Sequence, residues 1–416
     1  PMSKFYTSVE RYGQNILWRG YENGKQFSKK VKFQPTLFTN GKKDVTDTKY
    51  RSLATDKPLV PHQLDGMKEG KDFVERYKDV HGLEIAGNTN YVSQFIQEKY
   101  PDEIKFDASL INIVSFDIEV DIANGYPNVN EADKEITSIA YKSSKSADYH
   151  LLGRKDYDKS KTLLDLHPDN MQGTYQISGM TVVDYMDAFK KFGYKYGTQE
   201  SYKLDHIAYT VLGEKKLDYS EYGNLNALYE QNPQLYLDYN LKDTELIQRF
   251  EDETGLMSLV MTVAYGGGVN YQDAFGTVGI WETTLYRRLM KDGKVPPVKG
   301  EPGQRAGELV GGYVKDPKVG MHPWIVSFDL NSLYPHLMLQ YNMSPETYLE
   351  DERKQVSQDM VLEGRFQNDD PTMSVGANGA CFSNKFKGVI PSIIDEYYNN
   401  RKVIKQNMLK VEQQLE

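Results

Sequence analysis

The stretch VSFDLNSLYPHLM, residues 326–338, carries the strongest pattern in this chain of 416 residues. An apolar run ends at Asp329, a short polar turn follows, and a helix-like segment begins near Leu333. This order predicts a strand, a tight turn and a helix, with one carboxylate at the edge of a sheet. Carboxylates are the ligands that Mg²⁺ prefers, so Asp329 is a candidate metal ligand. An aspartate that follows a strand also commonly serves as a helix N-cap, which is the structural alternative.

Length and composition predict a multidomain globular protein with ordinary cores, since 39% of the residues are hydrophobic and 26% are charged. The net charge of -9 argues neither for nor against nucleic-acid binding, because such binding needs local clusters of Lys and Arg. A single cysteine, Cys381, excludes an intramolecular disulfide and a multi-cysteine zinc site. No apolar run reaches the length of a membrane span and no signal peptide is evident, so we expect a cytoplasmic protein.

Local patterns predict a succession of α+β and α/β regions. The first hundred residues contain strand-like runs, turns near Gly24 and Gly41, and a helix at 68–79. Two strands, INIVSFDIEV and EITSIAYK, precede helices at 185–192, 202–212 and 233–250. After a Pro- and Gly-rich linker at 294–303, we expect strands around GGYVKDP and WIVSFDL. A polar loop at 367–383 then leads to a final helix that opens after Pro391.

Two further groups of residues point to metal or phosphate chemistry. Asp117 and Glu119 occupy alternate positions of a predicted strand, so both side chains face the same side and can share a metal. Asp243 follows Tyr239 by one helical turn. Arg401 and Lys405 are likewise one turn apart, which places two cations where they can grip a triphosphate; a solvated charged face is the alternative.

In their order along the chain, these motifs resemble those of family B DNA polymerases from T-even-like bacteriophages. D-x-x-S-L-Y-P resembles motif A of the palm, and the segment from Gly388 onward resembles the entry into the first fingers helix. Asp117 with Glu119, and Tyr239 with Asp243, resemble the first and third motifs of the 3′–5′ exonuclease domain. The resemblance implies a multidomain α/β and α+β fold: an N-terminal module, an RNase H-like exonuclease domain, part of a palm and the first fingers helix.

The resemblance also implies a role for each matching residue and two Mg²⁺ ions in each active site of the complete enzyme. In the polymerase site, Asp329 and the Leu330 carbonyl bind metal, and Tyr334 lies under the incoming sugar, where it disfavours a ribose 2′-OH; a buried aromatic is the alternative for Tyr334. Nucleotide binding is implied for Leu330, Ser332, Leu333, Tyr334, Arg401 and Lys405. Catalysis and metal binding in the exonuclease site are implied for Asp117, Glu119 and Asp243, with Tyr239 orienting water. DNA contact is implied for Gly311, Gly312 and Tyr313, although a plain turn is equally compatible with these glycines.

One motif of the family is missing. Between residues 120 and 238 no asparagine is followed shortly by Phe-Asp or Tyr-Asp, and HPDN runs directly into MQGTYQISG. We therefore expect an internally deleted exonuclease domain with degenerate proofreading. The expected domains are a first part of the N-terminal domain at 1–107, the exonuclease-like domain at 108–254, and a return to the N-terminal domain with the linker at 255–297. The first part of the palm is expected at 298–386, and the start of the fingers at 387–416.

The palm motif D-T-D, which carries the second catalytic carboxylate in this family, does not occur in the chain. The preferred hypothesis is therefore the N-terminal part of a replicative DNA-directed DNA polymerase, which needs a C-terminal fragment for template-directed nucleotidyl transfer. A stand-alone 3′–5′ exonuclease and a catalytically inert DNA-binding fragment are the alternatives. Expected partners are primer-template DNA, deoxynucleoside triphosphates and the C-terminal fragment. A sliding clamp is expected only through a missing C-terminal segment, the membrane is not a partner, and the expected location is the cytoplasm of a bacterial host.

Overall fold

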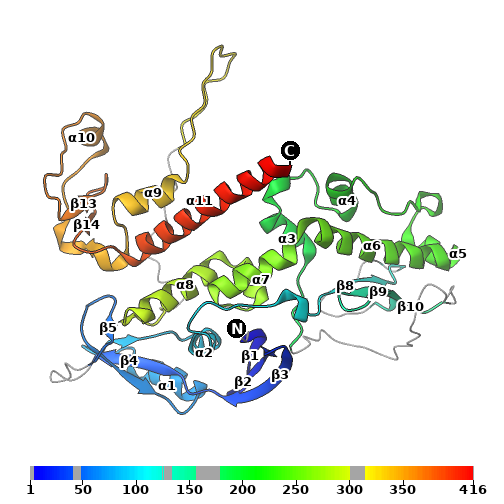
Figure 1. Ribbon diagram of the computed structural model, residues 1–416, viewed down its shortest axis with the longest axis horizontal. Coiled ribbons are helices and arrows are strands. Elements are labelled where there is room, and N and C mark those ends of the chain that lie inside the picture. The colour runs from blue at the N-terminus through cyan, green and yellow to red at the C-terminus, as the bar shows by residue number, and fades with distance from the viewer. Residues whose placement is uncertain are drawn as a thin grey trace. The chain divides into compact units, whose positions relative to one another are not determined.

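The computed structural model describes residues 4–40, 48–123, 125, 134–155, 179–299 and 314–415 (Figure 1). The chain forms two compact units, and each unit is built from two separate stretches of sequence. Unit 1 contains Pro1–Phe33 and Phe95–Thr284, and unit 2 contains Gln34–Gln94 and Leu285–Glu416. Two helices, α2 (Tyr91–Lys99) and α8 (Thr277–Lys291), contribute residues to both units. None of the helices in the described part of the chain combines the length and apolar character that a membrane span requires.

Unit 1 begins with an antiparallel sheet of β1 (Lys4–Tyr12), β2 (Asn15–Glu22) and β3 (Lys25–Lys32). Asn23 and Gly24, with φ of 56° and 77°, form the two-residue turn between β2 and β3, as the turn predicted near Gly24 requires. The sheet is tied to the end of unit 1 by Asn270, whose side chain exchanges hydrogen bonds of 3.0 and 2.9 Å with the Val9 backbone. This pairing brings together segments that are far apart in sequence.

A second antiparallel sheet of unit 1 has the order β10-β9-β8 and consists of β8 (Val114–Val120), β9 (Ile136–Ser143) and β10 (Tyr149–Gly153). Helix α6 (Pro233–Thr254) packs along one face of this sheet (Figure 1). Side chains alternate between the two faces of a strand, so Asp117 and Glu119 share one face while Phe116 and Ile118 point to the other and are exposed. The core beneath α6 is formed by Ala140, Leu151, Leu228, Tyr236 and Leu237.

The remaining helices of unit 1 are α3 (Tyr185–Phe192), α4 (Leu204–Leu212), α5 (Leu225–Gln231) and α7 (Leu256–Gly267). The helices predicted at 185–192, 202–212 and 233–250 are confirmed, with small differences at their ends. Helix α6 begins after Asn232, whose side chain accepts a hydrogen bond of 3.1 Å from the Leu235 amide, and Pro233 occupies its first turn. A core of apolar side chains joins α3, α4, α6 and α7: Ala188, Phe189, Ile207, Ala208, Leu246, Phe250 and Leu256.

The first stretch of unit 2 contains small paired strands and helix α1 (Met67–Tyr77). Strand β4 (Thr36–Asn40) pairs antiparallel with both β6 (Leu59–Gln63) and β7 (Ile85–Ala86). Strand β5 (Arg51–Ser52) pairs parallel with β11 (Lys294–Val295). The predicted helix at 68–79 corresponds to α1. Buried side chains from these strands form the local core, namely Phe38, Leu59, Ala86 and Val295.

The second stretch of unit 2 contains α9 (Leu333–Gln340), α10 (Gln358–Leu362) and the long helix α11 (Val389–Leu415), which lies beside α9 (Figure 1). The predicted loop at 367–383 is wrong in part, because it contains two short strands, β13 (Met373–Val375) and β14 (Cys381–Ser383). They pair with each other, and β14 also pairs with β12 (Tyr348–Leu349). Strands of two or three residues in a polar segment are too short to show the alternation of apolar and polar residues that predicts a strand. Cys381 is a buried free thiol.

The strands predicted around GGYVKDP and WIVSFDL are wrong within the described residues, since 314–330 forms no strand and every residue of it is exposed. A strand needs a neighbouring strand to pair its backbone amides and carbonyls, and no described residue supplies one here. Helix α11 begins at Val389 rather than after Pro391. Pro391 is accommodated in the first turn, where its missing N–H leaves no helical hydrogen bond unmade.

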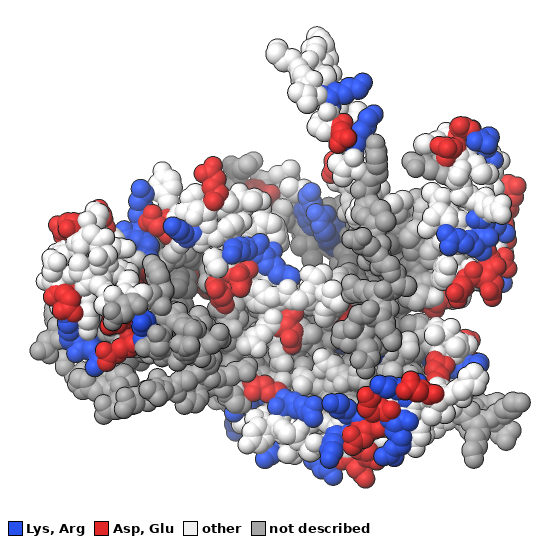
Figure 2. Space-filling model, turned by 180° about the vertical axis from the view of Figure 1, so that it is seen from behind, with Lys and Arg blue, Asp and Glu red and all other residues white. Residues whose placement is uncertain are grey.

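Acidic and basic side chains are interspersed over the described surface that Figure 2 presents. Several of the acids and bases form exposed ion pairs, such as Lys4 with Glu22 at 2.9 Å in unit 1. The described part of this face therefore carries no broad patch of one sign that would attract nucleic acid.

Candidate metal centre

Three carboxylates of unit 1 meet at the face of the β10-β9-β8 sheet that α6 covers. Asp117 and Glu119 come from β8, Asp243 comes from α6, and their ligand oxygens all lie within 4.8 Å of one another. Among the described residues this is the only group of three or more potential ligands at such distances. Because side chains alternate along β8, Asp117 and Glu119 point to the same face of the sheet, and the packing of α6 against that face brings in Asp243.

Hydrogen bonds between side chains orient Asp117. Asn240, which is fully buried on α6, donates a hydrogen bond of 2.8 Å to Oδ2 of Asp117. Its own Oδ1 accepts a hydrogen bond of 2.6 Å from the hydroxyl of Ser138 on β9. Ser138 is paired with Glu119 across the two strands. The carboxylate of Asp117 is thus fixed by a chain of polar contacts that runs through the interface between the sheet and α6.

A lysine from the loop before α5 enters the acid cluster. Nζ of Lys216 lies 2.5 Å from Oδ2 of Asp243 and 4.5 Å from the centre of the Tyr239 ring. Tyr239 is buried on the same face of α6 as Asp243 and packs edge-on against Tyr219, with ring centres 5.2 Å apart. Lys216 therefore offsets part of the negative charge of the cluster and contacts both residues of the Y-x-x-x-D pattern.

Burial and mutual repulsion change the proton affinity of the three acids. Burial, together with the negative charges of Asp117 and Asp243, raises the pKa of Glu119 to about 7. Burial also raises the pKa of Asp243 to about 6, although Lys216 acts in the opposite direction. The pKa of Asp117 is raised by burial as well, against the hydrogen bond from Asn240. Unless a cation is bound, the site holds its negative charge at a cost in free energy.

The donor set fits a hard divalent cation. Oδ1 of Asp243 is buried and accepts no hydrogen bond from the described residues, so one oxygen of the cluster is available as a ligand. Asp117 and Glu119 add carboxylate oxygens from the same strand, β8, and oxygen ligands suit Mg²⁺ and Mn²⁺. Lys216 already pairs with the other Asp243 oxygen, Oδ2, and leaves Oδ1 open. This arrangement is suited to holding a divalent cation.

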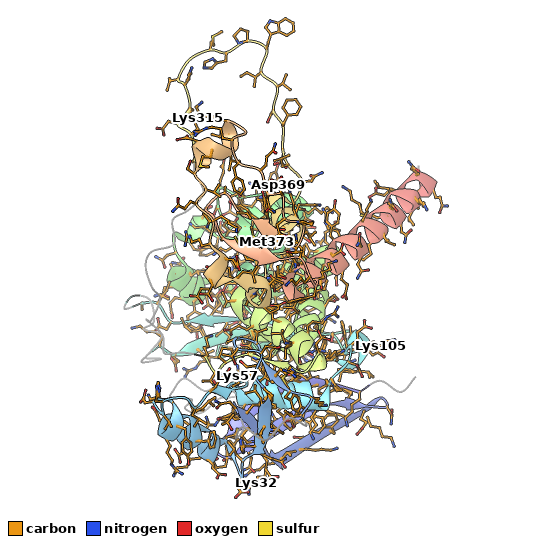
Figure 3. All side chains as sticks on the ribbon, turned by 90° about the vertical axis from the view of Figure 1, so that its left-hand side faces the viewer. Lys32, Lys57, Lys105, Lys315, Asp369 and Met373 are labelled. Atoms are coloured by element: carbon orange, nitrogen blue, oxygen red, sulfur yellow. The ribbon has the colours of Figure 1, made fainter. Side chains whose placement is uncertain are left out.

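The residues of motif A are arranged differently from expectation. Asp329 and Leu330 lie in the exposed stretch 314–330, and Figure 3 shows the side chains beyond Lys315 projecting outward from this loop. The N-cap of α9 is Ser332, with φ of 54°, so the alternative reading of Asp329 as an N-cap is wrong. Leu333 opens α9, and Tyr334 is 69% exposed, so the alternative reading of Tyr334 as a buried aromatic is also wrong.

Arg401 and Lys405 lie on α11, in a part of the helix where every described residue from Asn399 to Leu415 is exposed. The guanidinium group of Arg401 and the ammonium group of Lys405 are therefore both accessible to a ligand. Gly311, Gly312 and Tyr313 lie outside the described residues, as does 156–178, the segment around the expected deletion. The predictions made for these residues stay predictions.

Sequence reasoning missed Lys216, Asn240 and Ser138. Asn240 directly follows Tyr239 and lies one helical turn before Asp243, so its helical spacing was a usable signal. Lys216 is one of two consecutive lysines in a polar loop, and nothing in the local pattern distinguishes it from its neighbour Lys215. Ser138 lies between Thr137 and Ile139 in β9 and looks like an ordinary strand residue.

The chain is similar in sequence to known DNA polymerases. The family model of DNA polymerase family B matches residues 279–416. The chain is 25% identical to the DNA-directed DNA polymerase of Enterobacteria phage T4, over 100% of this chain and 55% of the phage protein. It is also 25% identical to the DNA-directed DNA polymerase of Escherichia phage RB69, over 98% of this chain and 54% of that protein. DNA polymerase II of Escherichia coli matches 54% of the chain at 25% identity. The chain spans about half the length of the phage relatives it matches.

Proposed function

Because the chain belongs to family B of the DNA polymerases, of the T4-like phage type, we propose that it supplies part of a replicative polymerase active site and that it copies DNA only together with a complementary polymerase segment. The need for a complementary segment is supported by apolar side chains that are exposed within unit 2. They occur in two places, the stretch 321–330 and the outer part of α11.

The stretch 321–330 contains large apolar side chains that are almost fully exposed. Trp324 is 99% exposed and Phe328 is 90% exposed. Single exposed apolar residues are normal, but a continuous run of them marks a surface that another segment covers. From Trp324 to Leu330 every second residue is apolar, which suits one face of a strand in a sheet whose neighbours the complementary segment supplies.

The outer part of α11 carries a stripe of apolar residues on one face. Tyr397, Ile404, Met408, Val411 and Leu415 follow spacings of three, four and seven residues, and all are exposed. This spacing is the pattern of a helix that packs against another helix. A helical segment of a polymerase fingers domain, presented by the complementary segment, is the occupant that we propose.

In the completed site, Asp329 and the Leu330 carbonyl would hold Mg²⁺. The bound metal would stabilise the charge that develops on the attacking and leaving oxygens. Arg401 and Lys405 would neutralise the triphosphate of the incoming nucleotide, because both are accessible cations one turn apart on α11. Tyr334 would contact the sugar and favour deoxynucleotides. The primer-template and the nucleotide are thus the proposed partners.

Hydrogen exchange tests the proposed association directly. A polypeptide with the remaining fingers and palm of a T4-like polymerase is mixed with the chain, and amide exchange is followed by mass spectrometry. We expect slowed exchange at 321–330 and along α11 from Ile404 to Leu415, since both acquire partners. A chain with Ile404→Lys and Met408→Lys should bind more weakly, whereas exposed Gln406→Lys should not. Unchanged exchange in both segments contradicts the proposal.

The acid cluster favours a second function, hydrolysis of a DNA 3′ end, in a degenerate form. The available Oδ1 of Asp243 beside Asp117 and Glu119 supports a bound Mg²⁺, which would lower the pKa of a water molecule and orient it for attack. Tyr239 would orient this water. Lys216 would hold the Asp243 carboxylate in place through their ion pair.

Two measurements separate metal binding from hydrolysis. Isothermal titration with Mn²⁺ should reveal one saturable site that is lost in Asp117→Ala, while Asp148→Ala, an exposed acid of the same unit, should bind normally. With 5′-labelled single-stranded DNA and Mg²⁺, we expect slow shortening from the 3′ end that Asp117→Ala abolishes. Cleavage that persists in Asp117→Ala would show that another site, or a contaminating nuclease, is responsible.

A further inference from the structure

We propose that Asn342 is a positioning residue, which fixes the first turn of α11 and thereby sets the direction of the helix that carries Arg401 and Lys405. The inference rests on the proposed nucleotide-binding role of α11 for its functional meaning. The positioning of α11 by Asn342 is argued from hydrogen bonds within unit 2, and it can be tested in the 416-residue chain by itself.

The side chain of Asn342 connects three backbone positions in the segment that leads into α11. Asn342 lies just after α9 and is buried. Its Nδ2 donates hydrogen bonds of 2.7 Å to the Ser383 carbonyl and 2.8 Å to the Phe386 carbonyl. Its Oδ1 accepts a hydrogen bond of 2.8 Å from the Gly388 amide. An asparagine amide is suited to this role because one planar group both donates and accepts. With φ of 53°, the residue also adopts a left-handed conformation that asparagine tolerates.

Two further side chains of the same loop cap the first turn of the helix. Oε1 of Glu346 accepts a hydrogen bond of 2.5 Å from the Val389 amide. The hydroxyl of Ser344 accepts one of 3.3 Å from the Ile390 amide and donates one of 2.8 Å to Oε2 of Glu346. The first amides of a helix have no partner within the helix, so these contacts satisfy them. The negative charge of Glu346 also suits the positive end of the helix dipole.

The loop and the helix start approach each other closely. A Cβ at Gly388 would lie 2.6 Å from Cβ of Ser344 and 3.2 Å from Cγ2 of Thr347. Only glycine fits at this contact without displacing the loop. Thr347 in turn donates hydrogen bonds to the carbonyls of Asn342 and Ser344, at 2.5 and 2.9 Å. The junction therefore combines the close approach of Gly388 to the loop with hydrogen bonds that hold the loop itself.

The direction of α11 depends on contacts around its start because, within the described residues, the helix is held only in its first part, up to Tyr398, where Glu396 also pairs with Arg288 at 3.3 Å. Ile393 packs in a small core with Leu289 and Val389, and Tyr398 packs edge-on against His336 of α9, with ring centres 4.8 Å apart. Beyond Tyr398 every described residue is exposed. A helix rises about 1.5 Å per residue, so Arg401 lies roughly 18 Å above Val389. A tilt of about 10° at the base would displace Arg401 by roughly 3 Å, enough to misplace a phosphate contact.

The first test measures the direction of α11 in the 416-residue chain. Spin labels are placed at Met338→Cys on α9 and Lys410→Cys on α11, in a Cys381→Ser background, and the distance between them is measured by double electron–electron resonance. We expect one narrow distance distribution for the parent and a broadened or shifted one for Asn342→Ala. The matched control Asn400→Ala, an exposed asparagine of the same helix, should behave like the parent.

A second variant and a second readout keep the inference testable. If Asn342→Ala does not fold, Glu346→Ala, which removes the acceptors of the Val389 amide and of the Ser344 hydroxyl, should also broaden the distribution. In the polymerase completed by its complementary segment, Asn342→Ala should raise KM for the nucleotide about tenfold with a smaller change in kcat. Asn342→Asp, which keeps the acceptor for the Gly388 amide, should recover part of the loss.

The outcomes distinguish this inference from the proposed function. A distance distribution that stays narrow and unshifted in folded Asn342→Ala and Glu346→Ala chains overturns the positioning role. A distribution that broadens while KM for the nucleotide is unchanged supports the positioning role and contradicts the nucleotide-binding role of α11.

Discussion

Replacement of Glu119 by glutamine should stabilise the chain in the absence of divalent cations. The carboxylate of Glu119 lies within 4.8 Å of two other carboxylates, and its side chain is half-buried. Glutamine has nearly the same shape, and it removes the charge that burial and the neighbouring acids oppose. The variant therefore isolates the electrostatic cost of holding three acids together.

The magnitude follows from the pKa of Glu119, which is raised from 4.5 to about 7. Each pKa unit corresponds to about 1.4 kcal/mol, which gives an upper value of about 3 kcal/mol, and the partial exposure of the side chain reduces this to about 2 kcal/mol. Because the folded state binds the proton more tightly than the unfolded state, the parent loses stability as pH rises from 4.5 to 7. The gain in Glu119→Gln should therefore be complete at pH 8 and small at pH 5.

The assay is urea unfolding with a metal chelator at both pH values, followed by hydrogen exchange of peptides from β8 and α6. These peptides report on unit 1, since the chain has two units and one global transition is not expected. Glu221→Gln, a substitution at an exposed glutamate of the same unit, is the matched control and should change stability little at either pH. Saturating Mg²⁺ should stabilise the parent more than Glu119→Gln, because binding to the folded state adds to its stability.

The reasoning fails if Glu119→Gln is less stable than the parent at pH 8 with metal chelated. That result would mean that the Glu119 carboxylate is held by favourable contacts that outweigh the repulsion. An equal gain at pH 5 and pH 8 would also contradict it, because the effect would then not depend on charge.

Two further substitutions test the surroundings of the acid cluster. Lys216→Met should destabilise unit 1 by about 2 kcal/mol at pH 8, because it leaves Asp243 without its ion-pair partner. The loss of stability should be smaller at pH 5, where Asp243 can take up a proton. A loss that is the same at both pH values in urea unfolding would contradict the ion pair. Asn240→Ala should lower the free energy of unfolding by about 2 kcal/mol, because it removes the hydrogen bonds to Asp117 and Ser138. It should also weaken Mn²⁺ binding in a calorimetric titration. Unchanged metal affinity would mean that Asn240 does not orient Asp117.

The sequence was most informative where apolar residues recur with helical spacing over many turns, or where side chains alternate strictly between the two faces of a strand. Helix α6 was predicted because its apolar residues recur over many turns, and its caps, Asn232 and Gly255, end the pattern clearly. The placement of Asp117 and Glu119 on one face followed from the alternation of a strand. That Asp243 joins them could be expected only from the resemblance, because no local rule brings α6 onto this sheet.

Features that depend on partners elsewhere in the chain were not predictable. Lys216 reaches Asp243 from a loop, and a loop lysine leaves no pattern in the sequence. The predicted strand ending at Asp329 is absent because a strand forms only beside another strand, and an apolar run cannot indicate whether its neighbour is present. The role of Asn342 was likewise hidden, since its three hydrogen-bond partners lie on a separate segment of unit 2.

Primer extension tests the central claim most directly. The chain is incubated with a primed template, deoxynucleoside triphosphates and Mg²⁺, alone and with the complementary polymerase segment. We predict no extension by the chain alone, because Asp329 by itself cannot organise two metal ions. We predict extension by the mixture that Asp329→Ala abolishes. Extension by the chain alone, lost in Asp329→Ala, would contradict the need for a complementary segment, and extension by the mixture that survives Asp329→Ala would contradict the assigned role of Asp329.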